Sequence, residues 1–378
     1  MQVLKQESIY LWNDGRQWYP LQMNLPITPI TDLAVKNNDL VAATSGRSFW
    51  ILDDLDLLRQ VDEEPTKIHV YQPAASVLLN GSSELNGNNP SFNGTNPLRG
   101  VNPANGAVIY YQLPKSESKE PIELTITTSS GELVRSYSSV KDTTFSRWAG
   151  GPPPAPVLGK KEGLNRFVWD LRYPILEGIP DVYIEGSYRR HKVIPGTYNI
   201  TVSQGEHSST TTIDVSPHPL YDTTTEQYEE YHLIMSEMEA TLSNMHRSVN
   251  EMADMRKDLF NASKKLSAND DLGVETKALI TKMKNWDDEM VQRKTQAYDD
   301  VENFPNKLSA NYLFLINQTE SDIVKVTEAA RKRKLELDEE WTPLREQASA
   351  ILNTEIPMVN KKLWEAGVGA IKLKKIKP

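Results

Sequence analysis

The chain has 378 residues, with 42 Lys and Arg against 51 Asp and Glu, a formal net charge of −9 and no cysteine. This length is too great for one hydrophobic core, so two or three domains are expected. The acidic balance opposes a general nucleic-acid-binding role, because such a role needs a basic face. The absence of cysteine excludes disulfides, thiolate metal sites and a cysteine nucleophile.

Targeting signals are not visible in the sequence. Residues 1–7 contain no basic segment followed by an apolar core, so no signal peptide is recognised. No apolar run approaches the roughly 20 residues that are needed to span a bilayer. We therefore expect no transmembrane segment.

Residues 1–60 have the pattern of short antiparallel strands. Apolar runs at residues 40–43 and 49–52 flank a turn centred on Gly46, which is typical of a β-hairpin with strands at residues 40–44 and 48–53. Gly46 supplies a backbone conformation that a residue with a Cβ would resist. Asn37 and Asn38 form a second turn signal. The other predicted strands of this region are residues 8–11, 18–22 and 32–35.

The segment WNDGRQW, residues 12–18, resembles a degenerate Asp-box, the S-x-D-x-G-x-x-W turn of BNR repeats. Gly15 and Trp18 match the pattern, whereas Leu11 and Asn13 stand where it has Ser and Asp. In that family the Asp-box locks a hairpin and is not a catalytic motif.

A second segment, GRSFWILDDL at residues 46–55, resembles the end of the last blade in large BNR-repeat, sortilin-type β-propeller proteins, which are often labelled glycosyl hydrolases. The resemblance implies that residues 1–60 form a terminal blade, with the other propeller blades upstream. It also implies a secreted, periplasmic or cell-surface protein. One blade cannot bury both of its faces, since a propeller needs several blades around a channel.

Residues 61–106 are predicted to be a connector. Their second half, residues 80–106, is rich in Asn, Gly, Ser and Pro, a composition that cannot bury a core, so a long surface loop is expected. Residues 107–218 then show six or seven strand patterns separated by turn signals, which predicts a β-sandwich.

Two motifs in this second region support a family resemblance. GLNRFVWDLRYP at residues 163–174 and VIPGTYNITVS at residues 193–203 resemble the immunoglobulin-like domain of flagellar hook-capping proteins. The resemblance implies that Trp169 fills the core of the sandwich. Between the strands, residues 146–158 read as a polyproline-like loop that carries Trp148.

Residues 219–366 are predicted to form an antiparallel helical bundle, because apolar residues recur there at steps of three and four. Further helices are expected at residues 273–301, 306–318 and 321–366, with Pro343 and Pro357 bending or breaking the last one. Residues 367–378 read as a basic tail. The seam of the first helix consists of Tyr231, Met235, Met238, Leu242, Met245, Val249 and Met252.

The predicted fold class is therefore multidomain α+β, with a propeller-blade-like sheet, an immunoglobulin-like sandwich and a helical bundle. Four residues are candidates for ligand contact. Asp53 and Asp54 could act as acid and base on a sugar, but neighbours in a strand point to opposite faces, so a strand-end turn is the alternative. Arg47 could bind a carboxylate or tie strands together. Trp148 could stack on a sugar or pack on the proline loop.

The remaining motifs do not indicate a catalytic, cofactor or metal site. The six histidines are scattered and include no helical pair at i, i+4, and the sequence has no phosphate-binding loop, dinucleotide fingerprint or nucleophile elbow. No catalytic, cofactor-binding or metal-binding residue is therefore assigned.

The sequence favours a non-catalytic C-terminal accessory region of a secreted propeller protein, which binds a glycan or a protein. A stand-alone adhesion or interaction protein, using the blade edge or the helical bundle, is the alternative. An active glycoside hydrolase is the least favoured reading, since the catalytic acids of the resembling propellers lie in blades that are absent here.

Overall fold

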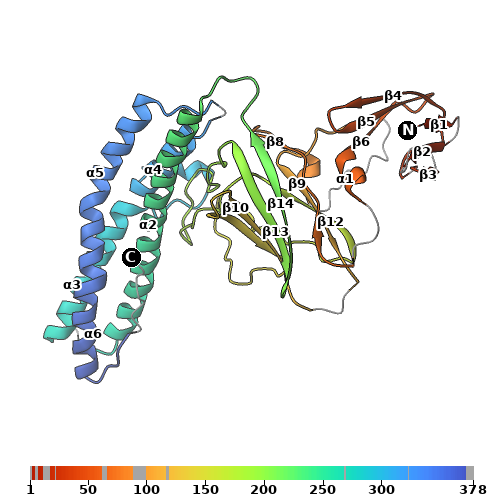
Figure 1. The fold of residues 1–378 in the computed structure, drawn as a ribbon. Helices are drawn as coiled ribbons and strands as arrows, with labels where there is room; N and C mark the ends of the chain where they lie inside the picture. Colours follow the sequence, from red (N-terminus) through yellow and green to blue (C-terminus); the bar gives the residue numbers. More distant parts are fainter. Residues whose placement is uncertain are drawn as a thin grey trace. The chain divides into compact units, whose positions relative to one another are not determined.

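The chain contains several β-sheets and a C-terminal helical region, which together make an α+β fold (Figure 1). It divides into two compact units that we describe separately: unit 1 consists of residues 1–141, 155–172 and 192–222, and unit 2 of residues 142–154, 173–191 and 223–378. The computed structural model describes residues 2–4, 7–11, 18–21, 23–61, 66–87, 99–115, 119–267, 270–321 and 323–371.

The N-terminal strands of unit 1 form a three-stranded antiparallel sheet in the order β1-β2-β3. The predicted Asp-box turn at residues 12–17 lies outside the described residues. The strands are β1 (Gln2–Leu4), β2 (Glu7–Leu11) and β3 (Trp18–Pro20).

A second three-stranded antiparallel sheet contains β4 (Ile30–Lys36), β5 (Asp39–Thr44) and β6 (Phe49–Leu52). It confirms the predicted hairpin, in which Gly46 has a φ of 85°. The register places Leu40 and Ala42 on one face, where both are buried.

A short helix, α1 (Leu55–Gln60), follows this sheet and was not expected from the sequence. The backbone N–H of Leu55 donates to the carbonyl of Asn38 at 2.8 Å, and the N–H of Asp56 donates to the Asn38 side-chain oxygen at 2.9 Å. The turn between β4 and β5 therefore satisfies the first donors of the helix. Asp54 precedes it with a left-handed φ of 58°, so it lies in a turn after β6 and not in the strand.

Two further sheets make up the rest of unit 1: a five-stranded sheet in the order β11-β10-β13-β14-β8 and a three-stranded sheet in the order β12-β9-β7. Neighbouring strands are antiparallel except β14 and β8. The strands are β7 (His69–Val70), β8 (Ser76–Val77), β9 (Ala107–Leu113), β10 (Ile122–Thr128), β11 (Leu133–Ser138), β12 (Gly163–Trp169), β13 (Gly196–Gln204) and β14 (His207–Ser216).

Aromatic side chains join these two sheets in the core of unit 1. The ring of Phe167 on β12 lies 4.5 Å from that of Tyr137 on β11, and Trp169 lies 5.8 Å from Tyr198 on β13. Trp169 is completely buried, which confirms its predicted place in a core. Side chains of β9 and β12 alternate between this core and the opposite face of their sheet.

Unit 2 consists mainly of helices. The first one begins with a capping box in which Thr224 and Gln227 satisfy each other's backbone donors. The helices are α2 (Thr225–Ser263), α3 (Asp271–Met290), α4 (Leu308–Thr319), α5 (Glu328–Ala350) and α6 (Ile356–Glu365), with a 3-10 turn at Tyr298–Glu302 and a π-helical turn at Ile351–Glu355.

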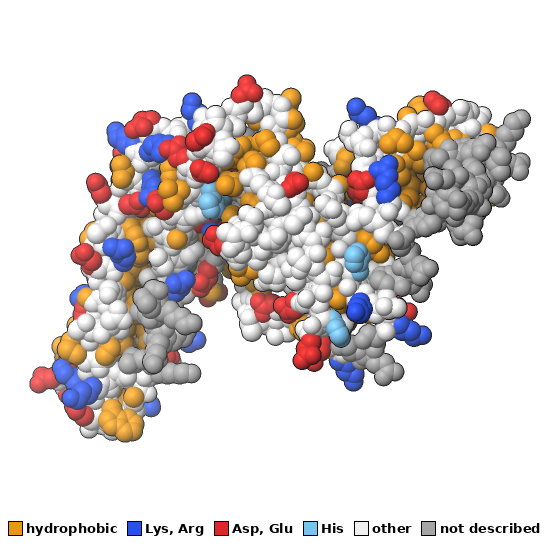
Figure 2. Space-filling view, viewed as in Figure 1, with side chains coloured by type: hydrophobic (Ala, Val, Ile, Leu, Met, Phe, Trp, Pro, Cys, Tyr) orange, Lys and Arg blue, Asp and Glu red, His pale blue; other side chains and the backbone are white. Residues whose placement is uncertain are grey.

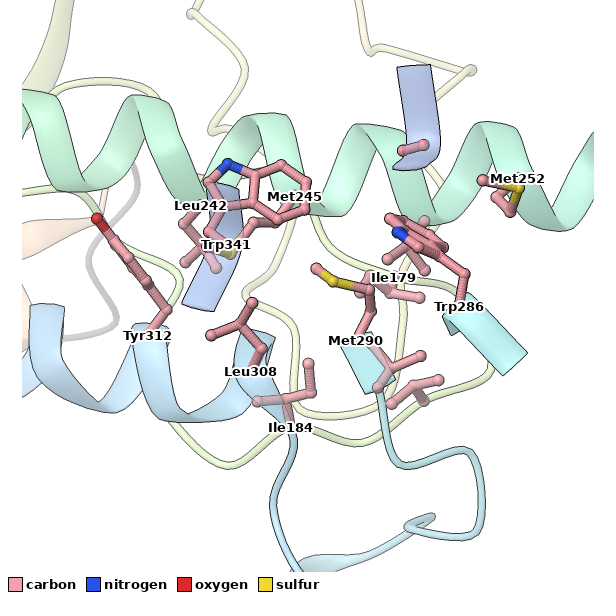
Figure 3. Close-up of a cluster of buried hydrophobic side chains, with 14 of the residues drawn as sticks. Ile179, Ile184, Leu242, Met245, Met252, Trp286, Met290, Leu308, Tyr312 and Trp341 are labelled. Carbon is pink, nitrogen blue, oxygen red and sulfur yellow. The ribbon is translucent and has the colours of Figure 1, made fainter. Parts of the chain in front are cut away.

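The predicted apolar seam of α2 is confirmed, because every member from Tyr231 to Met252 is buried in one hydrophobic cluster. Figure 3 shows Met245 and Met252 of this seam with Trp286 and Met290 of α3. Ile179, from a non-helical segment of unit 2, lies among them.

Two predicted helix boundaries in unit 2 are wrong. Pro343 does not break the last helix but lies inside α5, where the buried side chains of Leu337 and Trp341 offset the cost of about 3 kcal/mol of an interior proline. The break predicted at Pro357 is confirmed, because a π-helical turn at Ile351–Glu355 interrupts the helix directly before Pro357, which lies in the first turn of α6. Helix α3 ends at Met290, well before the predicted residue 301.

Within the described residues, none of the helices combines the length and the apolar character that crossing a bilayer would require. Acidic and basic side chains are interspersed over the helical region on the face seen in Figure 2. The predicted basic tail, residues 367–378, is described only as far as residue 371.

Replacing the buried Trp169 by alanine should destabilise unit 1 by about 3–5 kcal/mol, as large aromatic truncations in cores do. Leu164 on the same strand is 48% exposed, so Leu164→Ala is the matched control and should change stability little. Thermal and urea unfolding of the full-length variants check this. Equal losses for the two variants would contradict the core position of Trp169.

Candidate functional site

A cavity of about 590 Å³ in unit 1 brings together charged residues from distant parts of the sequence. Its charged lining residues are Asp39, Asp53, Asp54 and Arg166. Amide, hydroxyl and small apolar side chains complete the wall, among them Asn80, Ser82, Asn102, Ala74, Val77 and Pro103. This combination of a concave shape, a largely uncharged wall and a few convergent charges is typical of a small-ligand site.

The floor of the cavity is the outer face of the sheet that contains β9 and β12. Tyr110 and Arg166 are direct partners in the register of these strands, and both are only partly buried. Their neighbours Tyr111 and Phe167 point into the core instead. Strand alternation therefore places a phenol and a guanidinium side by side on the face opposite the core.

The guanidinium of Arg166 is held in place by backbone carbonyls. Its two terminal nitrogens donate to the oxygens of Leu85 and Gly87, each at 2.8 Å. That loop is in turn fastened by Asn105, whose backbone N–H donates to the Asn86 side chain at 2.7 Å. The positive charge at the cavity is thus fixed before any ligand arrives.

Asp54 reaches this floor from the turn between β6 and α1. Its Oδ2 accepts a hydrogen bond of 2.8 Å from the Tyr110 hydroxyl. Burial raises the pKa of Asp54, whereas the Tyr110 hydrogen bond and the charge of Arg166 act in the opposite direction. The left-handed backbone of Asp54 is unusual for a residue with a side chain, and strained conformations of this kind cluster at functional sites.

Asp53, its neighbour, lines the same cavity but keeps more surface exposed to solvent. Partial desolvation, together with the negative charges of Asp39 and Asp54, raises the pKa of Asp53 to about 6, although Arg166 acts to lower it. Asp53 therefore exchanges its proton close to neutral pH, where a carboxyl group normally remains ionised.

These groups can bind a polar ligand through several hydrogen bonds at once. Ionised carboxylates accept hydrogen bonds from hydroxyl or amino groups, while a protonated Asp53 can also donate one. No set of three or more His, Asp or Glu side chains among the described residues has the geometry of a metal site.

The structure brings together two of the four residues singled out from the sequence. Asp53 and Asp54 share the cavity, whereas Arg47 is exposed in the β5–β6 turn, where its backbone carbonyl accepts the indole N–H of Trp50 at 3.0 Å. Trp148 belongs to unit 2, where it is half-buried. Ligand contact by Arg47 or Trp148 stays a prediction.

Sequence reasoning missed Asp39, Tyr110 and Arg166. Asp39 follows the Asn37-Asn38 turn and looks like an ordinary turn residue. Tyr110 and Arg166 could have been noticed as polar side chains at the outward positions of two alternating strands, but nothing local pairs them with Asp54.

A second polar cluster, in unit 2, pairs two histidines that the sequence left apart. His191 Nδ1 lies 2.9 Å from Glu239 and its Nε2 lies 2.8 Å from His232 Nδ1. Arg190 also donates to Glu239 at 2.5 Å. Burial alone would raise the pKa of Glu239, but the hydrogen bonds and charges of His191 and Arg190 hold this pKa below its usual value. This cluster fastens residues 190–191 to α2.

A larger hollow of about 770 Å³ lies along α3 in unit 2. Its charged side chains include Lys282, which is paired with Glu355 at 2.6 Å. The hollow is open and contains no convergent group comparable to the aspartates of unit 1. We therefore take the cavity of unit 1, and not the larger hollow, as the candidate site.

Comparisons with known proteins identify no family for this chain. No family model matches it, and no curated protein does. Among solved structures, the apo structure of a β-glucuronidase from Ruminococcus gnavus is weakly similar, with 11% identity and a TM-score of 0.14, over 40% of this chain and 16% of that chain. A similarity at this level assigns neither a fold nor an activity, and the chain spans only 16% of that enzyme's length.

Replacing Asp53 by asparagine should stabilise the protein at neutral pH. The folded state raises the pKa of Asp53 from its ordinary 3.8 to about 6, so ionisation removes stability as the pH rises through this window. The melting temperature of Asp53→Asn should exceed that of the wild type at about pH 7.5, and the difference should shrink at about pH 4.

Glu132→Gln is the matched control, because Glu132 is an exposed carboxylate at a turn. It should show no comparable rise at neutral pH. A melting-temperature difference between Asp53→Asn and the wild type that is the same at both pH values would contradict the raised pKa.

Proposed function

We propose that unit 1 binds a hydroxyl-rich ligand, with an oligosaccharide as the favoured class, in the cavity around Asp53 and Asp54. The observation that supports this most is the convergence of three carboxylates and one fixed guanidinium in a cavity of about 590 Å³. That volume lies within the range of about 300–1,000 Å³ of small-ligand pockets.

Sugar chemistry suits this lining. Neighbouring sugar hydroxyls can donate a hydrogen bond to a carboxylate and accept one from a guanidinium or an amide. Asp54 can therefore accept from one hydroxyl while Arg166 donates to another. Small apolar side chains such as Ala74 and Val77 can contact the C–H surfaces of a pyranose ring. The role is binding and not catalysis.

The proposal also covers the domain organisation of the chain and the class of protein to which it belongs. The GRSFWILDDL motif supports a C-terminal accessory region of a secreted BNR-repeat, sortilin-type propeller protein, in which residues 1–60 are the last blade. The two facing sheets of residues 107–218 are consistent with an immunoglobulin-like sandwich, and the helices of residues 219–366 with an antiparallel bundle. In this arrangement the cavity lies where the blade meets the sandwich strands.

The binding test uses the full chain and a panel of neutral and acidic oligosaccharides, measured by calorimetry or by NMR titration. Asp54→Asn and Arg166→Gln should each weaken binding by at least about tenfold, because hydrogen bonds to charged groups contribute about 1.5–3 kcal/mol. Asp56→Asn is the matched control, since Asp56 is two residues away, pairs with Arg59 and does not line the cavity.

Failure of every sugar in the panel to bind at millimolar concentration would overturn the proposal, as would an equal loss for Asp56→Asn. The same samples should release no product from aryl glycosides or polysaccharides. Turnover that disappears in Asp53→Asn or Asp54→Asn would show a hydrolase instead of a binding protein.

A second candidate function is self-association or partner binding through β6, and one observation favours it. Phe49 and Ile51 lie on the face opposite Leu40 and are 72% and 61% exposed. Among the described strands β6 is at the edge of its sheet, so its outer backbone groups are also open to pairing. An apolar face beside an open edge is a typical interaction surface.

If this surface binds a second copy of the chain, light scattering at tens of micromolar should show dimers. The double variant Phe49→Ser/Ile51→Thr should then be monomeric, because the apolar area that stabilises the contact is lost. Leu133→Ser, which removes a side chain that is 59% exposed on β11, is the matched control and should leave the dimer intact. A wild-type chain that stays monomeric at all concentrations would exclude self-association.

A further inference from the structure

Besides the hydroxyls of Thr276 and Ser309, unit 2 buries three polar side-chain atoms that have no hydrogen-bond partner within the described part of the chain. They are the indole nitrogen of Trp148, the hydroxyl of Tyr188 and Nε2 of His246. Tyr188 is 1% exposed and His246 is completely buried. A buried polar atom without a partner costs about 1–3 kcal/mol, so three of them in one region require an explanation.

The three residues all contact one short segment, residues 176–178, Trp148 and His246 through their side chains and Tyr188 through its backbone. His246 Nδ1 lies 2.6 Å from the carbonyl oxygen of Glu177, and the carbonyl of Tyr188 accepts the N–H of Leu176 at 2.8 Å. The indole of Trp148 lies directly on Gly178, where an added Cβ would be only 2.0 Å from a ring carbon. The absence of a side chain at Gly178 thus makes room for the indole.

Ring geometry confirms this proximity. The Trp148 and Tyr188 rings have centroids 5.2 Å apart in an edge-to-face arrangement, and the Tyr188 and His246 rings are 6.1 Å apart. Burial raises the pKa of Tyr188 to about 12, while the nearby Trp148 indole N–H acts to lower it. The indole N–H and the hydroxyl therefore lie close together without meeting in a hydrogen bond of normal geometry.

The hydrogen-bonding capacities of the three atoms are complementary. His246 donates from Nδ1 to the Glu177 carbonyl, so its Nε2 carries a lone pair and can only accept. Burial lowers the pKa of His246 to about 4, which keeps the ring neutral at ordinary pH. The indole N–H of Trp148 can only donate, whereas the hydroxyl of Tyr188 can do either. A group between them must accept from the indole and donate to the imidazole.

We propose that Trp148, Tyr188 and His246 form an internal binding site for one water molecule. Water accepts two hydrogen bonds and donates two, and buried waters typically make about three. An ammonium ion cannot accept from the indole, and a halide cannot donate to Nε2, so neither fits the same set of atoms. The bound water links the 142–154 loop, the 173–191 segment and α2, three stretches of unit 2 that are distant in the sequence.

Removal of the Tyr188 hydroxyl distinguishes a water-bound site from three unpartnered atoms by the sign of its effect. If the hydroxyl binds the water, Tyr188→Phe in the full chain should lower the melting temperature of unit 2 by about 2–4 °C. If the hydroxyl has no partner, its removal should leave the melting temperature unchanged or raise it, and that result would overturn the proposal. Tyr183→Phe, in the same segment, is the control for the loss of a half-buried hydroxyl.

A direct observation completes the test. A high-resolution crystal structure of the wild-type chain should show one ordered water within about 3 Å of both the Trp148 indole nitrogen and His246 Nε2. The Tyr188→Phe crystal should retain that water with one partner fewer. A direct hydrogen bond from Tyr188 to His246, with no density for a water, would overturn the proposal.

Discussion

The alternation of side chains along β9 and β12 is the constraint on which unit 1 depends. Every second residue of these strands enters the core, where Phe167 and Trp169 meet aromatic rings of the facing sheet. The residues between them must then face outward, and this places Arg166 in the lining of the cavity with Tyr110 beside it. The core and the candidate site are therefore two faces of the same strands, and a one-residue shift in register would exchange them.

Unit 2 depends on a different constraint, the three- and four-residue spacing of apolar side chains on α2. The seam buries a row of methionines against α3 and α4, where flexible thioethers fill an irregular interior. Glu239 lies within this helix and is completely buried. Its charge is tolerated because Arg190 supplies positive charge and both Arg190 and His191 donate hydrogen bonds to it, so residues 190–191 are held to the helix by polar contacts as well as by packing.

The polar cavity of unit 1 is costly for folding. Asp53 and Asp54 are adjacent carboxylates near Asp39, and Asp54 adopts a left-handed backbone. Repulsion, desolvation and strain all disfavour this arrangement, and Tyr110 and Arg166 compensate part of it. Sites that lower the stability of the fold in this way are typically retained for binding or catalysis, because a ligand can supply further hydrogen bonds to their polar groups.

The sequence alone determined the features that follow from short-range periodicity. The hairpin around Gly46 follows from two apolar runs that flank a turn, and the seam from Tyr231 to Met252 follows from a period of about three and a half residues. The burial of Trp169 was implied by the resemblance of its motif to an immunoglobulin-like domain. Only the tertiary structure decided where those patterns stop. Pro343 stays within a helix because packing outweighs its intrinsic cost, and the unpredicted helix α1 follows β6 because Asn38 satisfies its first backbone donors.

The candidate site was accessible to sequence reasoning only in part. Asp53 and Asp54 were recognised as neighbours in a motif, but their partners Tyr110 and Arg166 come from strands far along the chain. The same holds for His191 and His232, and for Trp148, Tyr188 and His246, whose contacts depend on how loops fold onto α2. The spacing of apolar residues along the chain indicates on which face of its own helix or strand a residue lies. Which faces meet is decided by the packing of elements, and no local pattern in the chain carries that information.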